Sequence, residues 1–106
     1  MMDLTICYDR PDFFGGNTLT EDSRRNPEQQ KIKKAFSYFK KTKETSLKVN
    51  DREADTGYVL FWESYSDYDN GIVTARKYDR GHFSPTEEWK ISTEKARKFF
   101  YGLFEE

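Results

Sequence analysis

The sequence has few of the residues that build reactive or cross-linked sites. Its 106 residues include one cysteine, Cys7, and one histidine, His82. A lone thiol excludes an intramolecular disulfide, and one cysteine with one histidine cannot supply the usual ligands of a zinc site. No G-x-x-x-x-G-K, G-x-G-x-x-G or G-x-S-x-G pattern occurs, so nucleotide-binding and acyl-transfer motifs are absent. We therefore predict a protein that is not an enzyme and has no catalytic residue, cofactor or metal.

Long apolar runs are missing as well. No stretch approaches the ~18 apolar residues of a membrane span, and the N-terminal MMDLTICYDR lacks the basic region and apolar run of a secretion signal. A chain with a single cysteine is also typical of a reducing compartment. These absences predict a cytoplasmic protein with no membrane partner.

Aliphatic residues are scarce, but aromatic residues are not. Hydrophobic and charged residues each make up 35% of the chain, a balance that leans toward disorder, whereas 17% of the residues are aromatic. Large rings recover much of the buried area that the short aliphatic list lacks. The length is typical of one domain. We predict a single folded domain, residues 1–106, with an aromatic-rich core.

Two amphipathic helices are predicted from apolar residues at positions i, i+3, i+4 and i+7. The two stripes are Ile32, Ala35, Phe36 and Phe39, and Ala96, Phe99, Phe100 and Leu103. Asn26-Pro27 is a predicted start of the first helix, with Asn26 as the cap and Gln29 as the capping-box residue. Ser92 is the predicted cap of the second helix.

Alternating and β-rich segments predict strands at 3–8, 46–49, 58–65 and 72–78, with an irregular strand within 82–91 that Pro85 breaks. The segment 58–65 is apolar on both faces, which is typical of a central strand. Asn70-Gly71 predicts a tight hairpin turn, and the composition of 12–25 predicts a loop. The fold class is α+β: an antiparallel sheet of four to five strands, in the order β-α-β-β-β-(β)-α, with both amphipathic helices on one face.

The formal charge of −1 hides a separation of sign along the chain. Between residues 24 and 43, Glu28 is the single acid. The basic residues of that stretch are Arg24, Arg25, Lys31, Lys33, Lys34, Lys40, Lys41 and Lys43. The rest of the chain is therefore acidic. Such asymmetry favours a macromolecular partner that meets one of the two charged regions.

The acidic region is the predicted site for a protein partner. It consists of Asp51, Glu53, Asp55, Asp67 and Asp69, with Tyr65 and Tyr68 as aromatic contacts. Acidic groups beside tyrosines can imitate phosphates or meet a basic patch on an enzyme. We predict a stoichiometric inhibitor of a nuclease or a host-defence enzyme, of the kind that immunity proteins and phage or mobile-element proteins supply.

Two alternatives stay open. In the first, the helix at 26–43 binds nucleic acid through Arg24, Arg25, Lys33, Lys34, Lys40 and Lys41. In the second, more remote alternative, Glu88-x-Lys90 has the spacing of a magnesium-dependent nuclease, with Asp79 or Asp69 as a further ligand. The acidic turn before Gly71 resembles a calcium loop only briefly, because its spacing does not match the EF-hand.

Overall fold

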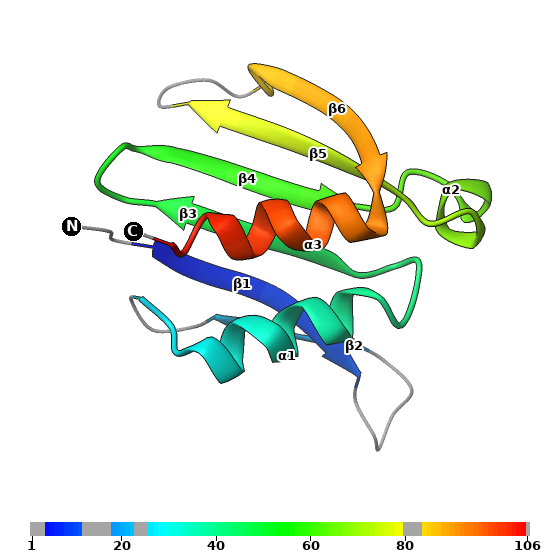
Figure 1. Cartoon of the computed structure of the whole chain (residues 1–106), viewed down its shortest axis with the longest axis horizontal. Helices are drawn as coiled ribbons and strands as arrows, with labels where there is room; N and C mark the ends of the chain where they lie inside the picture. Colours follow the sequence, from blue (N-terminus) through cyan, green and yellow to red (C-terminus); the bar gives the residue numbers. More distant parts are fainter. Residues whose placement is uncertain (1–3, 12–17, 23–25, 80–83, 106) are drawn as a thin grey trace.

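The computed structural model describes residues 4–11, 18–22, 26–79 and 84–105. These residues form one antiparallel sheet with the strand order β2-β1-β3-β4-β5-β6, and helices α1 and α3 lie on the same face of it (Figure 1). The strands are β1 (Leu4–Pro11), β2 (Thr18–Asp22), β3 (Ser46–Asp51), β4 (Thr56–Phe61), β5 (Ile72–Asp79) and β6 (Glu87–Ser92). The helices are α1 (Gln29–Phe39), α2 (Tyr65–Asp69) and α3 (Thr93–Gly102).

This arrangement confirms the predicted α+β class and the two amphipathic helices on one face. Two elements differ from the prediction. Thr18–Asp22 pairs with β1 as a sixth strand, although the composition of 12–25 predicted a loop. The pairing with β1 makes this segment a strand, although its sequence shows no pattern that predicts one. The short helix α2 lies directly before Asn70-Gly71, in a connection between β4 and β5 for which only a tight hairpin turn was predicted.

The core lies between the sheet and the helices α1 and α3. The predicted stripe of α1 is buried, and so are Ala96 and Phe100 of α3. The Phe36 ring lies 5.9 Å from the Phe100 ring and 5.7 Å from the Phe39 ring, centroid to centroid. These ring contacts confirm the aromatic-rich core, and they join the two helices across the middle of the sheet.

Strand β4 is central, as its two apolar faces predicted. It pairs with β3 on one side and β5 on the other. Leu60 faces the helices and is buried, whereas Val59 and Phe61 are half-buried on the opposite face. The strand ends at Phe61, four residues earlier than predicted, because the chain turns into α2.

The two helix starts have different outcomes. Ser92 caps α3, with its hydroxyl oxygen 3.2 Å from the Lys95 nitrogen, as predicted. The prediction for Asn26 is wrong, because α1 begins at Gln29 and its N-cap residue, Glu28, makes no side-chain cap hydrogen bond. Asn26 instead has a left-handed φ of 51° and exchanges two hydrogen bonds with Leu4, at 2.7 and 3.1 Å. The residue ties α1 to the start of β1.

Strand β6 begins after Pro85, which shortens the strand predicted within 82–91. Cys7 is half-buried in β1, and His82 lies outside the described residues. Across the described part of the chain, no helix has the length and apolar character needed to cross a membrane.

Candidate protein-binding surface

Helix α2 is a five-residue helix at the end of β4, with both of its ends fixed. Ser64 is its N-cap, and the Ser64 hydroxyl accepts a hydrogen bond from the Asp67 backbone nitrogen at 3.1 Å. Gly71 follows the helix with a φ of +69°, a conformation that favours glycine. Local sequence therefore explains where the helix starts and stops, although not that a helix forms there.

Side chains from other elements cap the C-terminal end of α1. The Phe39 carbonyl accepts hydrogen bonds from the Trp62 indole nitrogen at 3.0 Å and from the Thr45 hydroxyl at 2.7 Å. The Tyr68 hydroxyl lies 2.9 Å from the Lys41 carbonyl oxygen and 3.2 Å from that of Lys40. The last carbonyls of a helix have no partner within the helix, so these bonds both satisfy them and hold α2 against α1.

The two tyrosines of α2 point in different directions. The Tyr68 ring meets the Trp62 ring edge to face, with 5.0 Å between centroids, so Tyr68 faces inward. Tyr65 faces outward with 64% of its surface exposed, and among the described residues it is the one large hydrophobic side chain in the exposed class. Tyr68 thus anchors the helix against Trp62, and in this orientation of the helix Tyr65 points to solvent.

Tyr65 is held in place although it is exposed. Its hydroxyl donates a hydrogen bond to the Glu44 carboxylate, and the Lys43 ammonium lies 5.3 Å from the centre of its ring. The hydrogen bond from Tyr65 lowers the pKa of Glu44 below its ordinary value. The same bond and the negative charge of Glu44 raise the pKa of Tyr65.

Asp69, four residues after Tyr65, lies on the same face of the helix. We call Tyr65, Asp69, Lys43 and Glu44 the Tyr65 surface.

Asp67 is not part of this surface. The Lys90 ammonium lies 3.0 Å from the Asp67 carboxylate and 2.8 Å from that of Glu63, and only 17% of the Asp67 side chain is exposed. The bond from Lys90 lowers the pKa of Glu63, and its bonds to Glu63 and Asp67 raise the pKa of Lys90. Asp67 therefore ties α2 to β6.

Glu88 and Lys90, the residues of the remote nuclease alternative, form ion pairs with different partners. Glu88 and Lys90 share one face of β6, as their spacing predicted, but Glu88 pairs with Arg76 at 3.3 Å. Lys90 pairs with Glu63 and Asp67 instead. Within the ranges the structure describes, no three acidic, histidine or cysteine side chains are grouped as metal ligands would be.

The predicted acidic region is divided in two. Asp51, Glu53 and Asp55 lie at the turn between β3 and β4, whereas α2 lies at the opposite end of β4 (Figure 1). The Asp51 carboxylate accepts hydrogen bonds from the backbone nitrogens of Glu53 and Ala54, both at 3.0 Å, so it shapes the turn. A single partner contact spanning both groups would have to cover the length of the sheet.

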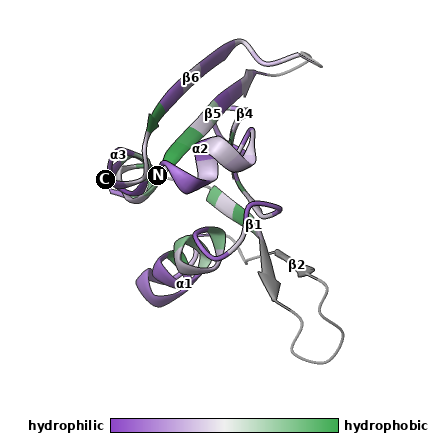
Figure 2. Cartoon of the chain, turned by 90° about the vertical axis from the view of Figure 1, so that its right-hand side faces the viewer, coloured by the Kyte–Doolittle hydropathy of each residue, from purple (hydrophilic) through white to green (hydrophobic). Residues whose placement is uncertain are grey.

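The lysines of α1 form a second charged surface. Lys33, Lys34, Lys40 and Lys41 are exposed, and the outer side of α1 is strongly hydrophilic (Figure 2). The ammonium groups of Lys34 and Lys41 lie 5.9 and 5.0 Å from the centre of the Tyr38 ring. Within the described part of the chain, no carboxylate forms an ion pair with these four lysines. We call them the lysine face. Arg24 and Arg25 lie outside the described residues.

Lys43 and Glu44 were missed as partners of Tyr65 in the sequence. They lie between α1 and β3, and the Tyr65–Glu44 bond joins residues 21 positions apart. Nothing in the local pattern of either segment predicts such a contact.

Comparison of the chain with known proteins gives no match to a family model, a curated protein or a solved structure.

Proposed function

We propose that the protein is a non-enzymatic binding protein that forms a stoichiometric complex with another protein through the Tyr65 surface. The observation that carries the proposal is the exposed but fixed Tyr65 ring. Tyrosine is enriched among the residues that dominate the energy of protein interfaces. A side chain held in position before binding loses less conformational entropy when the complex forms.

The charges around Tyr65 favour a protein over a nucleic acid at this surface. Glu44 and Asp69 are acidic and Lys43 is basic, so the ring is surrounded by both signs. A polyanion would be repelled by the two carboxylates, whereas a protein surface can present complementary charges and a slot for the ring. The partner that fits has a basic patch beside an apolar pocket.

An enzyme that handles nucleic acid has a basic patch of this kind. We therefore propose that the protein inhibits a nuclease or a host-defence enzyme in the cytoplasm, in the manner of immunity and anti-defence proteins. In this role Asp69 meets a cation of the partner and Tyr65 fills the neighbouring pocket.

The test uses the purified protein as bait in a nuclease-treated cytosolic extract, followed by titration calorimetry with the recovered partner. Tyr65→Ala is expected to weaken the complex by at least about 2 kcal/mol, the range of interface hot spots. Ser66→Ala, at the next position of α2, is the matched control and should bind like the unchanged protein. Equal affinity for both variants would remove Tyr65 from the interface.

Charge-reversal variants distinguish the contributions of the individual acidic residues to binding. Asp69→Lys changes an exposed carboxylate and is expected to weaken the complex without changing stability. Asp67→Lys also breaks the ion pair with Lys90, so its effect mixes folding with binding. Glu53→Lys, at the other end of β4, tests the acidic turn. Loss of binding in Glu53→Lys alone would place the interface at that turn.

A second candidate is nucleic-acid binding by the lysine face, which is supported by the four exposed lysines without an ion pair in the described part of the chain. Replacing Lys33 and Lys34 with alanine should then reduce affinity equally for all sequences and reduce the slope of log K against log salt by about 2. An unchanged slope would contradict this candidate. The substitutions leave the Tyr65 surface untouched, so the two candidates are tested separately.

A further inference from the structure

Strand β6 forms one edge of the sheet, and none of the other described elements lies beyond it (Figure 1). The free side of an edge strand has a row of unpaired backbone N–H and C=O groups, to which another strand can bind. Thr93 donates its backbone N–H to the Gly71 carbonyl oxygen at 2.8 Å, and this pair continues the register of β5 with β6. Hydrogen-bonded pairs alternate along antiparallel strands. Trp89 therefore bonds to β5, whereas the N–H and C=O groups of Glu88 and Lys90 point away from the sheet.

The charged side chains of β6 do not block this edge. Natural edge strands often carry unpaired charges, especially lysine, or a proline, which hinder pairing with another chain. The Glu88 carboxylate instead lies 3.3 Å from the Arg76 guanidinium of β5. The Lys90 ammonium lies 2.8 Å from the Glu63 carboxylate and 3.0 Å from that of Asp67. Both charges are thus paired with groups on the inner side of β6, and the strand contains no proline.

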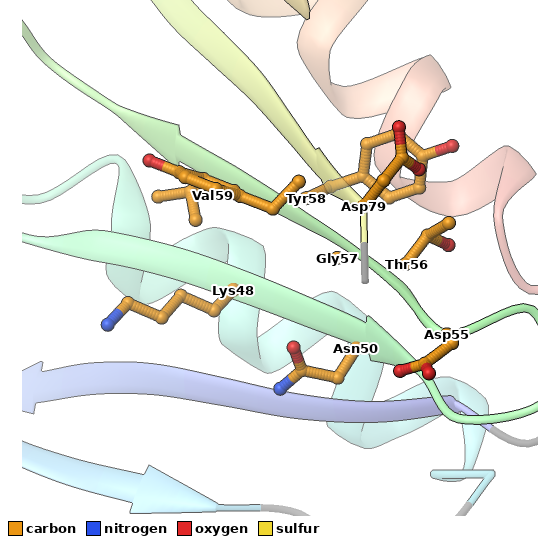
Figure 3. Close-up of a pocket in the computed structure, with 9 residues that line it drawn as sticks. Lys48, Asn50, Asp55, Thr56, Gly57, Tyr58, Val59 and Asp79 are labelled. Atoms are coloured by element: carbon orange, nitrogen blue, oxygen red, sulfur yellow. The ribbon is translucent and has the colours of Figure 1, made fainter. Parts of the chain in front are cut away.

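The sheet face opposite α1 and α3 is the other surface that a second copy could cover, and it is less suited to packing. It has a hollow of about 230 Å³ beside Gly57, with exposed Lys48 and Asn50 on its border (Figure 3). Sheets that pack face to face interdigitate apolar side chains, which a polar and hollowed face does not provide. The edge of β6 is therefore the better surface for self-association.

The sequence of β6 is complementary to that of a second β6. We propose that two copies of the chain form a dimer by antiparallel pairing of their β6 strands, about a two-fold axis at Trp89. This register places Glu88 of each copy opposite Lys90 of the other, so the outward backbone groups form hydrogen bonds and opposite charges face each other twice. Sliding one strand by two residues in either direction would instead place two Glu88 or two Lys90 side chains opposite each other, which is destabilising.

Trp89 lies at the centre of this interface. Its ring is half-buried against the Phe99 ring of α3, with 5.5 Å between the two centroids. In the proposed register the two Trp89 residues form a directly opposed pair without mutual backbone hydrogen bonds, with Cα atoms about 4.5 Å apart. Cross-strand aromatic pairs stabilise a sheet, and the pairing buries ring surface that one copy leaves exposed.

The dimer does not depend on the Tyr65 surface. Tyr65 contacts Lys43 and Glu44, which lie between α1 and β3, and not β6. Each copy therefore keeps its own Tyr65 surface, and the ratio of chain to bound partner stays one to one. Failure of either proposal leaves the other intact.

Sedimentation equilibrium of the purified protein over a range of concentrations tests the dimer. We expect the measured mass to rise toward twice that of one chain. Glu88→Pro removes one outward N–H from each copy, and therefore two hydrogen bonds from the dimer. Glu88→Ala is the matched control, because it loses the same ion pair with Arg76 but keeps the N–H. Glu88→Pro should dimerise at least about tenfold more weakly than Glu88→Ala.

Cysteine cross-linking tests the register without a proline. In a Cys7→Ser background, Trp89→Cys should form a disulfide between two copies, because a Cα separation of about 4.5 Å lies within the range of about 4.4–6.8 Å for disulfides. Ile91→Cys is the control and should not cross-link, because residue 91 lies opposite Glu87 of the second copy. The proposal would be overturned by the mass of one chain at every concentration, by equal dimerisation of Glu88→Pro and Glu88→Ala, or by cross-linking of Ile91→Cys but not of Trp89→Cys.

Discussion

Replacing Thr45 with valine and Trp62 with phenylalanine removes, one at a time, the two side-chain donors on the Phe39 carbonyl. Both side chains are buried, at 3% and 4% exposure. Each single variant loses about 1 kcal/mol for the hydrogen bond, and Trp62→Phe loses somewhat more through reduced burial. In either variant the Phe39 carbonyl keeps its other donor, at 2.7 or 3.0 Å.

The double variant leaves this buried carbonyl without either side-chain donor. An unsatisfied buried acceptor costs about 1–3 kcal/mol more, so the loss in the double variant should exceed the sum of the single losses by that amount. Urea denaturation of the four proteins measures the coupling directly. Additive losses, within about 0.5 kcal/mol, would refute the view that these two side chains jointly cap α1.

Three further predictions concern the core, the start of α1 and the junction of α2 with β6. Phe36→Ala should destabilise the fold by about 3–5 kcal/mol in urea denaturation, because the ring joins α1 to α3 through its contact with Phe100 and also packs against Phe39. A loss below about 1 kcal/mol would contradict this packing. Asn26→Ala should lower the free energy of unfolding by about 1–3 kcal/mol, because it loses the hydrogen bond to Leu4 and because alanine disfavours the left-handed φ. Asn26→Asp keeps the acceptor oxygen and should lose less. Equal losses in the two variants would exclude a role for that oxygen. The pKa of Glu63 is lowered on folding, so its contribution to stability is present above its ordinary pKa of 4.5 and is lost as the pH falls through the lower, folded value. Lys90→Met should raise the pKa of Glu63 in an NMR titration of its carboxyl carbon, and an unchanged pKa would show that the ion pair does not form in solution.

The amphipathic helices and the central strand could be predicted because their patterns are local. Ile32, Ala35, Phe36 and Phe39 repeat with the helical period, and all four are buried. Ser92 precedes such a pattern and caps α3. In each case the residues that determine the element are its own or its immediate neighbours.

Asn26 and α2 could not be predicted because their conformations depend on distant residues. Asn26 bonds to Leu4, 22 positions away, and that contact replaces the predicted capping role. Helix α2 is held by Tyr68, which reaches the end of α1, and by Asp67, which reaches Lys90. Asn70-Gly71 favours a turn locally, and these tertiary contacts add a helical turn before it.

The candidate site shows the same limit. Tyr65, Asp67 and Asp69 lie close together in the sequence, and their residue types make all three equally good candidates for an interface. In the structure Tyr65 and Asp69 face solvent, whereas Asp67 forms an ion pair with Lys90. Composition identifies residue types suited to an interface, but only the fold decides which of them a partner can reach.

The most direct test of protein binding through the Tyr65 surface is sedimentation-velocity analysis of the protein mixed with its captured partner, after nuclease treatment and at moderate salt. We expect a one-to-one complex that Ser66→Ala retains and Tyr65→Ala loses, while the Tyr65→Ala protein keeps the unfolding midpoint of the unchanged protein. A complex that disappears with nuclease, or that persists at full strength in Tyr65→Ala, would contradict it.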